Sequence, residues 1–316
     1  GLQVFHLAAE AREELKRIDE MGGAVAAIDS SYMKQKLVES NTQRLKAIET
    51  GEQIVVGVNK YQQTEPSPLS TGEDAIQVVP EHVERDQIER LNAWREARDA
   101  AKVEAALTAL REAAQEDRNV LPASIEAAKI GITTGEWAGL LREVYGEYRA
   151  PTGVSKSAQA PGEDLSEVRA RVDAVSEKLR RRLKFLVGKP GLDGHSNGAE
   201  QIAVRARDSG MEVVYEGIRL TPAEIVNAAL EEGVHVVGLS ILSGSHVQLV
   251  TDLMGLMREA GLAAIPVVVG GIIPPEDEKL LLESGVARVY TPKDFQLNDI
   301  MMDIVEVVDG LANKAA

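Results

Sequence analysis

The sequence is poor in several residue types, and each shortage narrows what the protein can be. Its 316 residues include no cysteine, which excludes a disulfide framework and any thiolate metal site. Lysine and arginine number 35 against 50 acidic residues, and a chain with a net charge of −15 lacks the clustered cations that nucleic-acid backbones require. No apolar run approaches the length of a membrane span, and no signal-peptide pattern is present. We therefore expect a cytoplasmic protein that binds neither nucleic acid nor a membrane.

The chain is long enough for more than one folded unit. Hydrophobic residues make up 44% of it, although only 3% of all residues are aromatic, so two domains can each bury a core. A stretch rich in proline, glycine and serine at 149–163 is typical of a linker and marks the main boundary. We predict three parts, over residues 1–62, 63–163 and 164–316, of which the second is a helical linker region.

The C-terminal part alternates short apolar runs with segments of helical periodicity, and the runs predict strands. The expected strands are 183–188, 211–215, 234–240, 264–270 and 287–291, and the expected helices are 198–209, 222–232, 246–260, 275–284 and 296–312. A short helix with an apolar stripe from Leu165 to Leu179 precedes them. Strands that alternate with helices favour an α/β fold with a doubly wound, five-stranded parallel sheet of the flavodoxin-like order 2-1-3-4-5.

Capping residues support these helix boundaries. Thr221 and Glu224 match a capping box with proline at the first helical position, and Ser245 and Gln248 repeat the pattern without proline. Glycines stand after four of the helices, where a left-handed residue is favoured, at Gly210, Gly233, Gly261 and Gly285.

The first half of the chain is predicted to be mainly helical. Helices are expected at 7–20, 30–50, 83–117 and 119–130. A capping box at Thr133 and Glu136 opens one more, whose apolar face from Trp137 to Tyr148 is expected to be a core face. The run 54–58 predicts a lone strand, which would have to pair with a larger body.

Three loops that follow strands of the predicted sheet carry unusual residues. They are Asp193, His195 and Gly198 after the first strand, Ser240, Leu242 and Gly244 after the third, and Gly270 and Gly271 after the fourth. The first loop contains neither of the common glycine-rich phosphate-binding patterns. Loops after parallel strands share one edge, and in the order 2-1-3-4-5 these three strands are neighbours. An imidazole, a hydroxyl and a pair of glycines therefore converge on one crevice.

The chemistry of these residues suits a metal that arrives already chelated. A neutral His195 nitrogen can ligate a transition metal, while Asp193 holds the other ring nitrogen and fixes the tautomer. The glycines leave room for a flat ligand against the backbone. One histidine alone makes a poor metal site, because protein sites need three or four ligands, but one is enough for a metal held in a macrocycle.

The motifs resemble those of a known family. Asp-x-His-x-x-Gly, Ser-x-Leu and Gly-Gly, separated here by residues 199–239 and 243–269, are similar to the cobalamin-binding domain of base-off/His-on corrinoid enzymes. The run 188–202 most resembles the ethylmalonyl-CoA mutases, and the methylmalonyl-CoA mutases are the near alternative. Residues 20–23 and 56–61 look like stretches that follow the substrate barrel of such mutases.

The resemblance implies a role for each motif residue. His195 would be the lower axial ligand of cobalt, in place of the cofactor's own benzimidazole, and Asp193 would support it. The nucleotide tail and its benzimidazole would be surrounded by Gly198, Ser240, Leu242, Gly244, Gly270, Gly271 and Tyr290. Lys189, in the same loop as His195, is expected to be a solvated lysine, with a phosphate of the tail as its alternative partner. His235 and His246 are expected to be structural.

The implied activity is an adenosylcobalamin-dependent radical rearrangement of an acyl-CoA, ethylmalonyl-CoA to methylsuccinyl-CoA, which makes the family isomerases. Residues 1–62 look like the end of a TIM barrel, so the resemblance implies the C-terminal part of a mutase, whether a piece, a proteolytic fragment or a subunit of a split enzyme. Its substrate-binding barrel would lie upstream, no catalytic residue is assigned here, and the full enzyme would be a homodimer. This part alone is expected to be inactive.

A non-catalytic corrinoid carrier or sensor is the alternative from a different class. Such carriers usually cap the corrin with a helical bundle, for which residues 83–148 are a candidate. The proline-rich stretch 62–80 and the motif at 56–61 do not fit a bundle, which favours the mutase.

Overall fold

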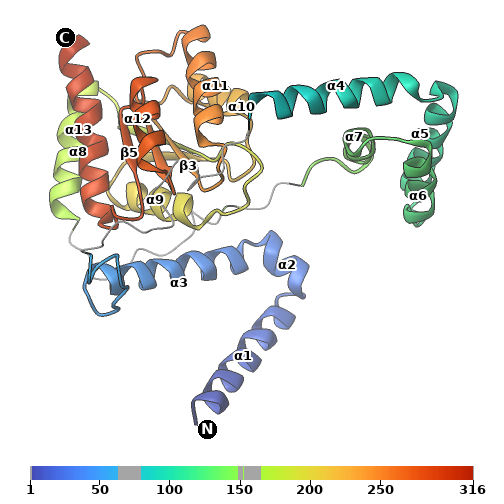
Figure 1. Ribbon diagram of the computed structural model, residues 1–316. Coiled ribbons are helices and arrows are strands. Elements are labelled where there is room, and N and C mark those ends of the chain that lie inside the picture. Colours follow the sequence, from blue (N-terminus) through green and yellow to red (C-terminus); the bar gives the residue numbers. More distant parts are fainter. Residues whose placement is uncertain (1, 63–79, 149–151, 153–164, 316) are drawn as a thin grey trace. The chain divides into compact units, whose positions relative to one another are not determined.

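The computed structural model describes residues 2–62, 80–148, 152 and 165–315, and the chain divides into two compact units (Figure 1). One unit joins Gly1–Gln63 to Ala150–Ala316, and the other is Thr64–Arg149. The N-terminal residues therefore share a unit with the C-terminal part of the chain. The predicted linker at 149–163 lies, except for residue 152, outside the described residues.

The larger unit is built on a parallel sheet with the strand order β2-β1-β3-β4-β5, which confirms the prediction. Its strands are β1 (Lys184–Gly188), β2 (Glu212–Tyr215), β3 (Val236–Ile241), β4 (Val267–Gly271) and β5 (Arg288–Tyr290). The three central strands are apolar runs, because helices cover both faces of a parallel sheet. The ends of β1, β3 and β4, where the motif loops begin, therefore lie side by side.

Three helices cover each face of this sheet (Figure 1). On one face lie α8 (Ser166–Leu179), α9 (Asn197–Asp208) and α13 (Leu297–Ala315), and on the other α10 (Pro222–Glu232), α11 (His246–Glu259) and α12 (Pro275–Glu283). Phe185 of β1 belongs to the first core and Leu186 to the second, as strand alternation requires. Gly238 of β3 makes room for Phe185, since a Cβ there would lie 2.6 Å from its ring.

The N-terminal residues form α1 (Leu2–Glu20), α2 (Ala24–Asp29) and α3 (Tyr32–Glu49). Helix α3 packs on α9, where Val38 is fully buried in the first core and Thr42 Oγ1 donates a hydrogen bond of 2.9 Å to Gln201 Oε1. A segment far away in sequence thus becomes part of the sheet-containing unit.

The predicted strand at 54–58 is wrong, because these residues form a turn. The side chain of Asn59 accepts from the backbone of Val55 at 2.8 Å and donates to the carbonyl of Ile48 at 2.7 Å. Gly57 has a φ of 81°, which a strand residue does not adopt. The apolar side chains of the run have another use, described below.

The second unit consists, over its described residues, of α4 (Glu81–Ala97), α5 (Ala100–Gln115), α6 (Leu121–Ile130) and α7 (Thr134–Tyr145). The single helix predicted at 83–117 is wrong, since Arg98 is extended and the side chain of Asp99 caps α5 by accepting from Lys102 N. Tyr145 and Tyr148 are exposed, so the apolar face expected of α7 is buried only in part. No described helix is long and apolar enough to cross a membrane.

The capping predictions have mixed outcomes. The capping boxes at Thr133 and Thr221 are both present, with the expected glutamates. The box at Ser245 is wrong: its hydroxyl makes no capping bond in the described helix and instead lies 2.8 Å from the hydroxyl of Ser243. The four glycines predicted to end helices all have a positive φ.

Candidate functional site

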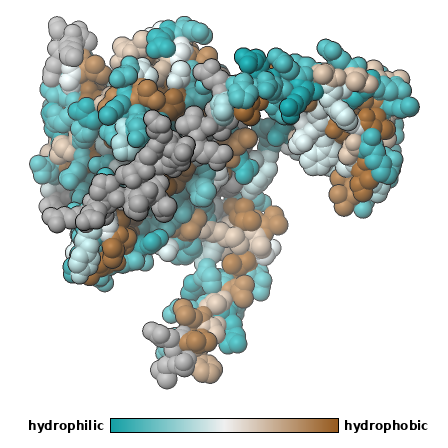
Figure 2. All heavy atoms as spheres, in the orientation of Figure 1, coloured by the Kyte–Doolittle hydropathy of each residue, from teal (hydrophilic) through white to brown (hydrophobic). Residues whose placement is uncertain are grey.

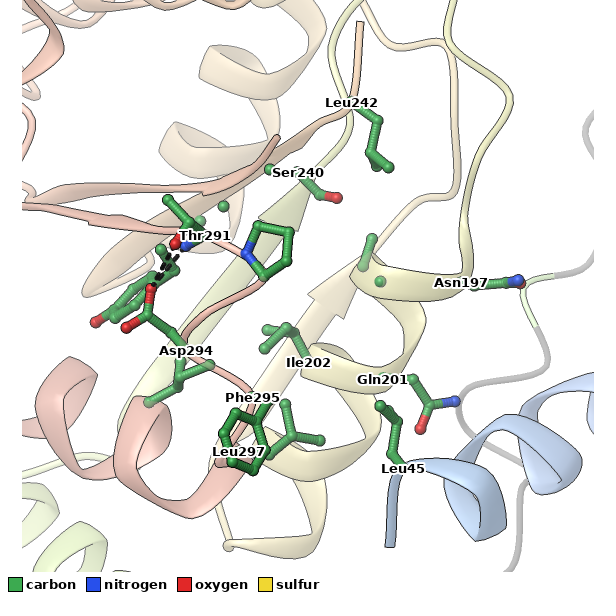
Figure 3. A pocket seen from close by; sticks show the side chains of 18 of the residues that line it. Leu45, Asn197, Gln201, Ile202, Ser240, Leu242, Thr291, Asp294, Phe295 and Leu297 are labelled. Carbon is green, nitrogen blue, oxygen red and sulfur yellow. Dashed lines mark hydrogen bonds between the residues drawn. The ribbon is translucent and has the colours of Figure 1, made fainter. Parts of the chain in front are cut away.

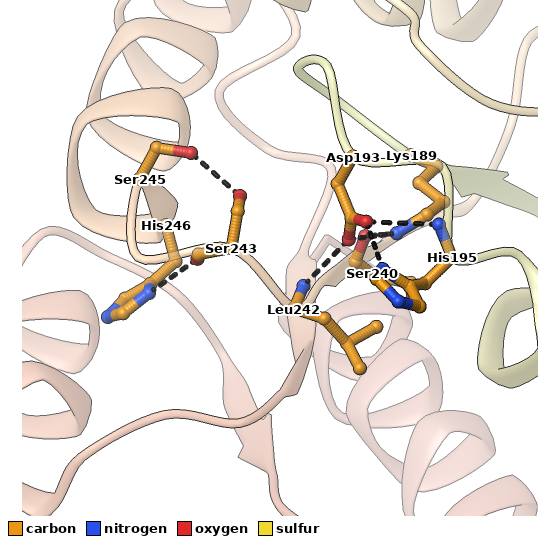
Figure 4. A network of polar contacts seen from close by, with 8 residues as sticks. All are labelled: Lys189, Asp193, His195, Ser240, Leu242, Ser243, Ser245 and His246. Carbon is orange, nitrogen blue, oxygen red and sulfur yellow. Dashed lines mark hydrogen bonds and ion pairs between the residues drawn. The ribbon is translucent and has the colours of Figure 1, made fainter.

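His195 stands on the loop after β1 and presents its ring to solvent. Its side chain is 80% exposed, while Nδ1 lies 2.6 Å from Asp193 Oδ1 (Figure 4). The same carboxylate oxygen accepts from the His195 backbone N–H at 3.0 Å. A carboxylate on Nδ1 keeps the proton there, so Nε2 retains a free lone pair.

Asp193 is buried beneath the imidazole and is held by three residues. Its Oδ2 accepts from Lys189 Nζ at 2.8 Å and from the backbone N–H of Leu242 at 3.3 Å, which ties the first motif loop to the one after β3. Burial works to raise the pKa of Asp193, but the hydrogen bonds from Lys189 and His195 outweigh it and hold that pKa well below the usual range. Asp193 is therefore a permanent anion beside the imidazole.

Lys189 contradicts the expectation of a solvated loop lysine. It is fully buried, and its Nζ also donates to the carbonyl of Ser240 at 3.3 Å. A buried ammonium group requires such partners. The only sign of this ion pair in the sequence was that Lys189 and Asp193 are four residues apart in a loop. That spacing is too common to indicate an ion pair by itself.

A cavity of about 520 Å³ opens beside this loop, between the sheet edge and helices α3, α9 and α13. Its lining is mainly apolar, with polar groups at Asn197, Gln201, Ser240 and Thr291 (Figure 3). That size and composition are typical of a pocket for an organic cofactor or part of one.

Most of the predicted tail-binding residues line this cavity. They are Gly198, Ser240, Leu242, Gly270, Gly271 and Tyr290. Gly244 is not among the lining residues, and neither are Asp193 and His195, which stand at the adjoining loop. The hydroxyl of Tyr290 donates to Asp303 at 2.9 Å, and burial, followed by that hydrogen bond, raises the pKa of Tyr290.

The glycines of the motifs have different structural reasons for lacking a side chain. A Cβ on Gly198 or Gly270 would find its nearest neighbour 3.9 Å away, so a side chain there would extend into free space that belongs to the cavity. A Cβ on Gly271 would lie 1.9 Å from the carbonyl oxygen of Ile241 on β3. Gly271 is therefore required by the close approach of two strands, whereas Gly198 and Gly270 leave space for a ligand.

One wall of the cavity comes from a segment that the sequence did not indicate. Its lining residues are Asn41, Arg44, Leu45, Ile48, Val55 and Val58. They lie on α3 and on the turn that was predicted to be a strand. Val55 and Val58 of the run 54–58 thus line the cavity. The sequence showed that this run resembles a mutase segment, but it did not show which residues the run contacts.

The two other histidines of this unit's core are structural, as predicted. His235 accepts from the Lys184 backbone N–H at 2.9 Å, and burial lowers its pKa to about 4. His246, 4% exposed, lies 2.7 Å from Asp277. It also lies 3.2 Å from the carbonyl of Ser243 (Figure 4). These contacts hold the loop that carries Leu242 and Ser243.

Comparison with known proteins gives the chain a family. A family model described as methylmalonyl-CoA mutase matches residues 5–147, and one described as B12 binding domain matches residues 183–294. The ethylmalonyl-CoA mutase of Cereibacter sphaeroides is 61% identical over 302 residues, which cover 96% of this chain and 46% of the relative. The ethylmalonyl-CoA mutase of Methylorubrum extorquens is 54% identical over 314 residues, 99% of this chain and 46% of the relative.

The methylmalonyl-CoA mutases are more distant, as the one from Escherichia coli shows, with 35% identity over 307 residues that cover 95% of this chain and 42% of the relative. The chain spans about half the length of the curated relatives it matches. Both matched regions coincide with the motifs from which the resemblance was drawn. The chain therefore belongs to the cobalamin-dependent acyl-CoA mutase family, of which it carries the part that contains the B12 binding domain.

Proposed function

We propose that this chain binds adenosylcobalamin through His195 and serves as the cofactor-binding part of a cytoplasmic mutase that converts ethylmalonyl-CoA to methylsuccinyl-CoA. The observation that carries the proposal is an exposed imidazole whose Nδ1 is held by the buried Asp193–Lys189 pair, beside a cavity of about 520 Å³. Methylmalonyl-CoA is the second candidate substrate. A homodimer is the proposed assembly of the full enzyme.

The residues present fit a corrinoid. Among the described residues no group of three or more His, Cys, Asp or Glu side chains could hold a metal ion. A metal that is already held in a macrocycle would need only one protein ligand, which His195 could supply. Gly198 and Gly270 leave open the space that a planar benzimidazole needs, and Ser240 offers it a hydroxyl. Leu192 and Ile272 are exposed on the same edge and provide apolar contacts for the corrin ring.

The chain's own residues prepare the ligand. Asp193 keeps the proton on Nδ1 of His195, so that Nε2 is the free ligand, and Lys189 keeps Asp193 ionised. The cavity would hold the nucleotide tail of the cofactor among its apolar side chains and the glycines of the motif loops. When bound, adenosylcobalamin supplies the radical chemistry that rearranges a carbon skeleton.

The test is to identify the axial nitrogen in the cobalt(II) form of the bound cofactor by electron paramagnetic resonance. The nuclear spin of the axial nitrogen splits this signal, into triplets for ¹⁴N and doublets for ¹⁵N. We expect protein labelled with ¹⁵N-histidine to give doublets, and His195→Ala to lose them or to lose the cofactor. Triplets from the labelled protein would show that the benzimidazole remains on cobalt and would overturn the assignment of His195.

A further inference from the structure

Lys34 of α3 reaches across to the first turn of α9, directly behind the proposed cobalt ligand. Its Nζ lies 2.8 Å from Ser196 Oγ and 2.6 Å from Glu200 Oε1. Ser196 follows His195 in sequence, so a residue more than 150 positions upstream contacts the neighbour of that histidine. Nothing in the motifs accounts for this contact.

The contact with Ser196 replaces an ordinary capping bond. Ser196 occupies the N-cap position of α9, where a serine hydroxyl normally accepts from a backbone N–H of the first turn. In the described helix its side chain makes no such bond, and it lies in the αR region at φ −99° and ψ −18°. The hydroxyl is directed to Lys34 instead. Helix stability alone does not explain that arrangement.

The charge of Lys34 stands in an unfavourable place. The N-terminus of a helix carries the positive end of its dipole and repels a cation. Glu200, in the first turn of α9, compensates for this with an ion pair, and its side chain is only 1% exposed. Its second oxygen, Oε2, has no hydrogen-bond partner among the described residues. Lys34 is thus the cation that balances the charge of this carboxylate, and the hydroxyl of Tyr215 is its other polar neighbour.

Further polar contacts hold α3 against α9 and α13. Gln201 Nε2 donates to the carbonyl of Val38 at 3.2 Å, and Glu49 Oε1 accepts from the backbone of Leu297 at 2.9 Å. Because α3 also supplies a wall of the cavity, its position affects both the ligand loop and the tail pocket.

We infer that Lys34 is a positioning residue for the cobalt ligand: it holds Ser196 and Glu200, and so fixes the start of α9 and the backbone from which His195 projects. Asp193 orients the ring, while Lys34 anchors the far end of the same loop. The loop is thus held by two lysines, Lys189 from below and Lys34 from α3. This inference rests on the proposed cobalamin binding.

The experiment compares Lys34→Met with Lys34→Arg in the full chain. We expect Lys34→Met to raise the Kd for cobalamin about tenfold or more, as loss of an outer contact does at metal sites. We also expect a smaller share of the bound cobalt(II) cofactor to show the ¹⁵N-histidine signal. Lys34→Arg keeps a charge and a donor at this place and restores most of both.

The matched control is Arg171→Met, which breaks a partly buried ion pair between α8 and α13, with Glu306 at 2.5 Å and Asp309 at 2.8 Å. It should lower the Tm of the apo-protein and leave the Kd and the histidine signal unchanged. If Lys34→Met behaves in the same way, Lys34 is merely structural and the inference is wrong.

A second variant covers the case in which Lys34→Met does not fold. Ser196→Ala keeps the Lys34–Glu200 ion pair and removes only the contact with the loop. We expect it to fold and to lose part of the histidine signal, whereas an unchanged signal would overturn the inference. If the unaltered chain binds cobalamin without histidine on cobalt, the proposed function itself fails, and this inference falls with it.

Discussion

At the scale of single residues, the chemistry of the site depends on a buried ion pair. Lys189 has no exposed surface and Asp193 has 6%, and each would be costly to bury alone. The pair leaves Asp193 ionised without exposing it, which makes it a stronger acceptor for His195 than a solvated carboxylate. The two residues thus determine which nitrogen of His195 is available.

Removing the cation should therefore disturb both folding and ligation. We expect Lys189→Met to cost about 3–5 kcal/mol, because it leaves a buried carboxylate without its partner. The lowered pKa of Asp193 stabilises the native chain at any pH above the usual pKa of an aspartate. That contribution is lost as the pH falls below this usual pKa. In the variant Asp193 lacks the hydrogen bond that lowers its pKa most, so this contribution should shrink, and the cost of the substitution should become smaller as the pH falls, which urea titrations at several pH values will detect.

Lys184, at the start of β1, is the control for this substitution. It pairs with Glu212 at 2.8 Å and Glu232 at 3.0 Å, and both carboxylates are about half exposed. Lys184→Met should cost no more than about 1 kcal/mol and leave the acid transition in place. Equal losses for the two lysines would contradict the special role of Lys189.

The motif residues could be recognised in the sequence, whereas the burial of Lys189 could not. Asp193 and His195 were recognisable because their spacing is short and their chemistry is specific. The burial of Lys189 depends on how the loop folds back against Ser240 on the next strand, which is a long-range contact. A lysine in a glycine-rich loop has the same local pattern whether it is solvated or paired.

At the scale of elements, two neighbouring glycines at the end of β4 are expected to have different roles, Gly270 in ligand binding and Gly271 in folding. Gly270→Ala adds a methyl group whose nearest neighbour is 3.9 Å away, on the cavity side. We expect it to weaken cobalamin binding and to leave the Tm of the apo-protein nearly unchanged. Gly271→Ala would place a Cβ 1.9 Å from the Ile241 carbonyl oxygen, and should destabilise the apo-protein by about 3 kcal/mol or more.

The measurements are thermal unfolding without cofactor and a spectral titration with cobalamin. A Gly270→Ala chain that loses stability but binds normally would show that both glycines serve the strand. Neighbouring positions thus act as controls for each other.

The helical unit offers a test of stability against pH. Hydrogen bonds from Arg98, and after them those from Thr133, lower the pKa of Glu136 to about 2 although burial opposes this. A lowered pKa stabilises the native state above the unfolded value of 4.5, and this contribution is lost as the pH falls from there toward 2. The contribution at neutral pH is on the order of 3 kcal/mol.

We expect Glu136→Gln to lower the stability of this unit at pH 7 and to flatten its dependence on acid. Both tryptophans of the chain, Trp94 and Trp137, lie in this unit, so their fluorescence follows its unfolding separately from the sheet. Glu143→Gln, which breaks the exposed pair with Arg111, is the control and should change little. An unchanged acid transition in the Glu136 variant would show that the Arg98 contact contributes nothing.

Helices and strands could be predicted where burial determines the pattern of apolar residues in the sequence. The five strands and the helices between them were recognised because each strand of a covered parallel sheet is an apolar run bounded by caps and glycines. The break between α4 and α5 was missed because Asp99 sits in a continuous helical pattern and acts as a cap only through its own geometry. The run at 54–58 was misjudged because an apolar composition is common to core strands and to cavity walls, and here Val55 and Val58 line the cavity while Ile54 and Val56 are exposed.

At the scale of the whole molecule, the sheet order brings together loops that are far apart in sequence, and the motifs were sufficient to predict this. They did not predict that α3 forms part of the same site. Periodicity shows that a helix has an apolar face but not which element covers it. The cavity proposed to hold the cofactor therefore extends beyond the residues matched by the B12 binding domain, 183–294, to the segment around Arg44 and Val58.

The largest consequence of this organisation concerns activity. We expect the 316-residue chain to bind cobalamin without isomerising any acyl-CoA. A radical rearrangement needs a substrate held against the open face of the cofactor and shielded from water. The imidazole of His195, the proposed cobalt ligand, is 80% exposed, and the chain spans 46% of the Cereibacter sphaeroides relative.

Helix α1 is consistent with this expectation, because it exposes apolar side chains of the kind that contact another part of a protein (Figure 2). Val4, Phe5, Leu7 and Leu15 are each more than 60% exposed. The measurement is turnover of ethylmalonyl-CoA first and methylmalonyl-CoA second by the cofactor-loaded chain, alone and with the N-terminal half of the Cereibacter sphaeroides enzyme. Activity should require the added half, because we expect that half to cover the open face of the cofactor and to hold the substrate there. Turnover by the chain alone would show that its own residues close the site, and would contradict the view that it is the cofactor-binding part of a larger enzyme.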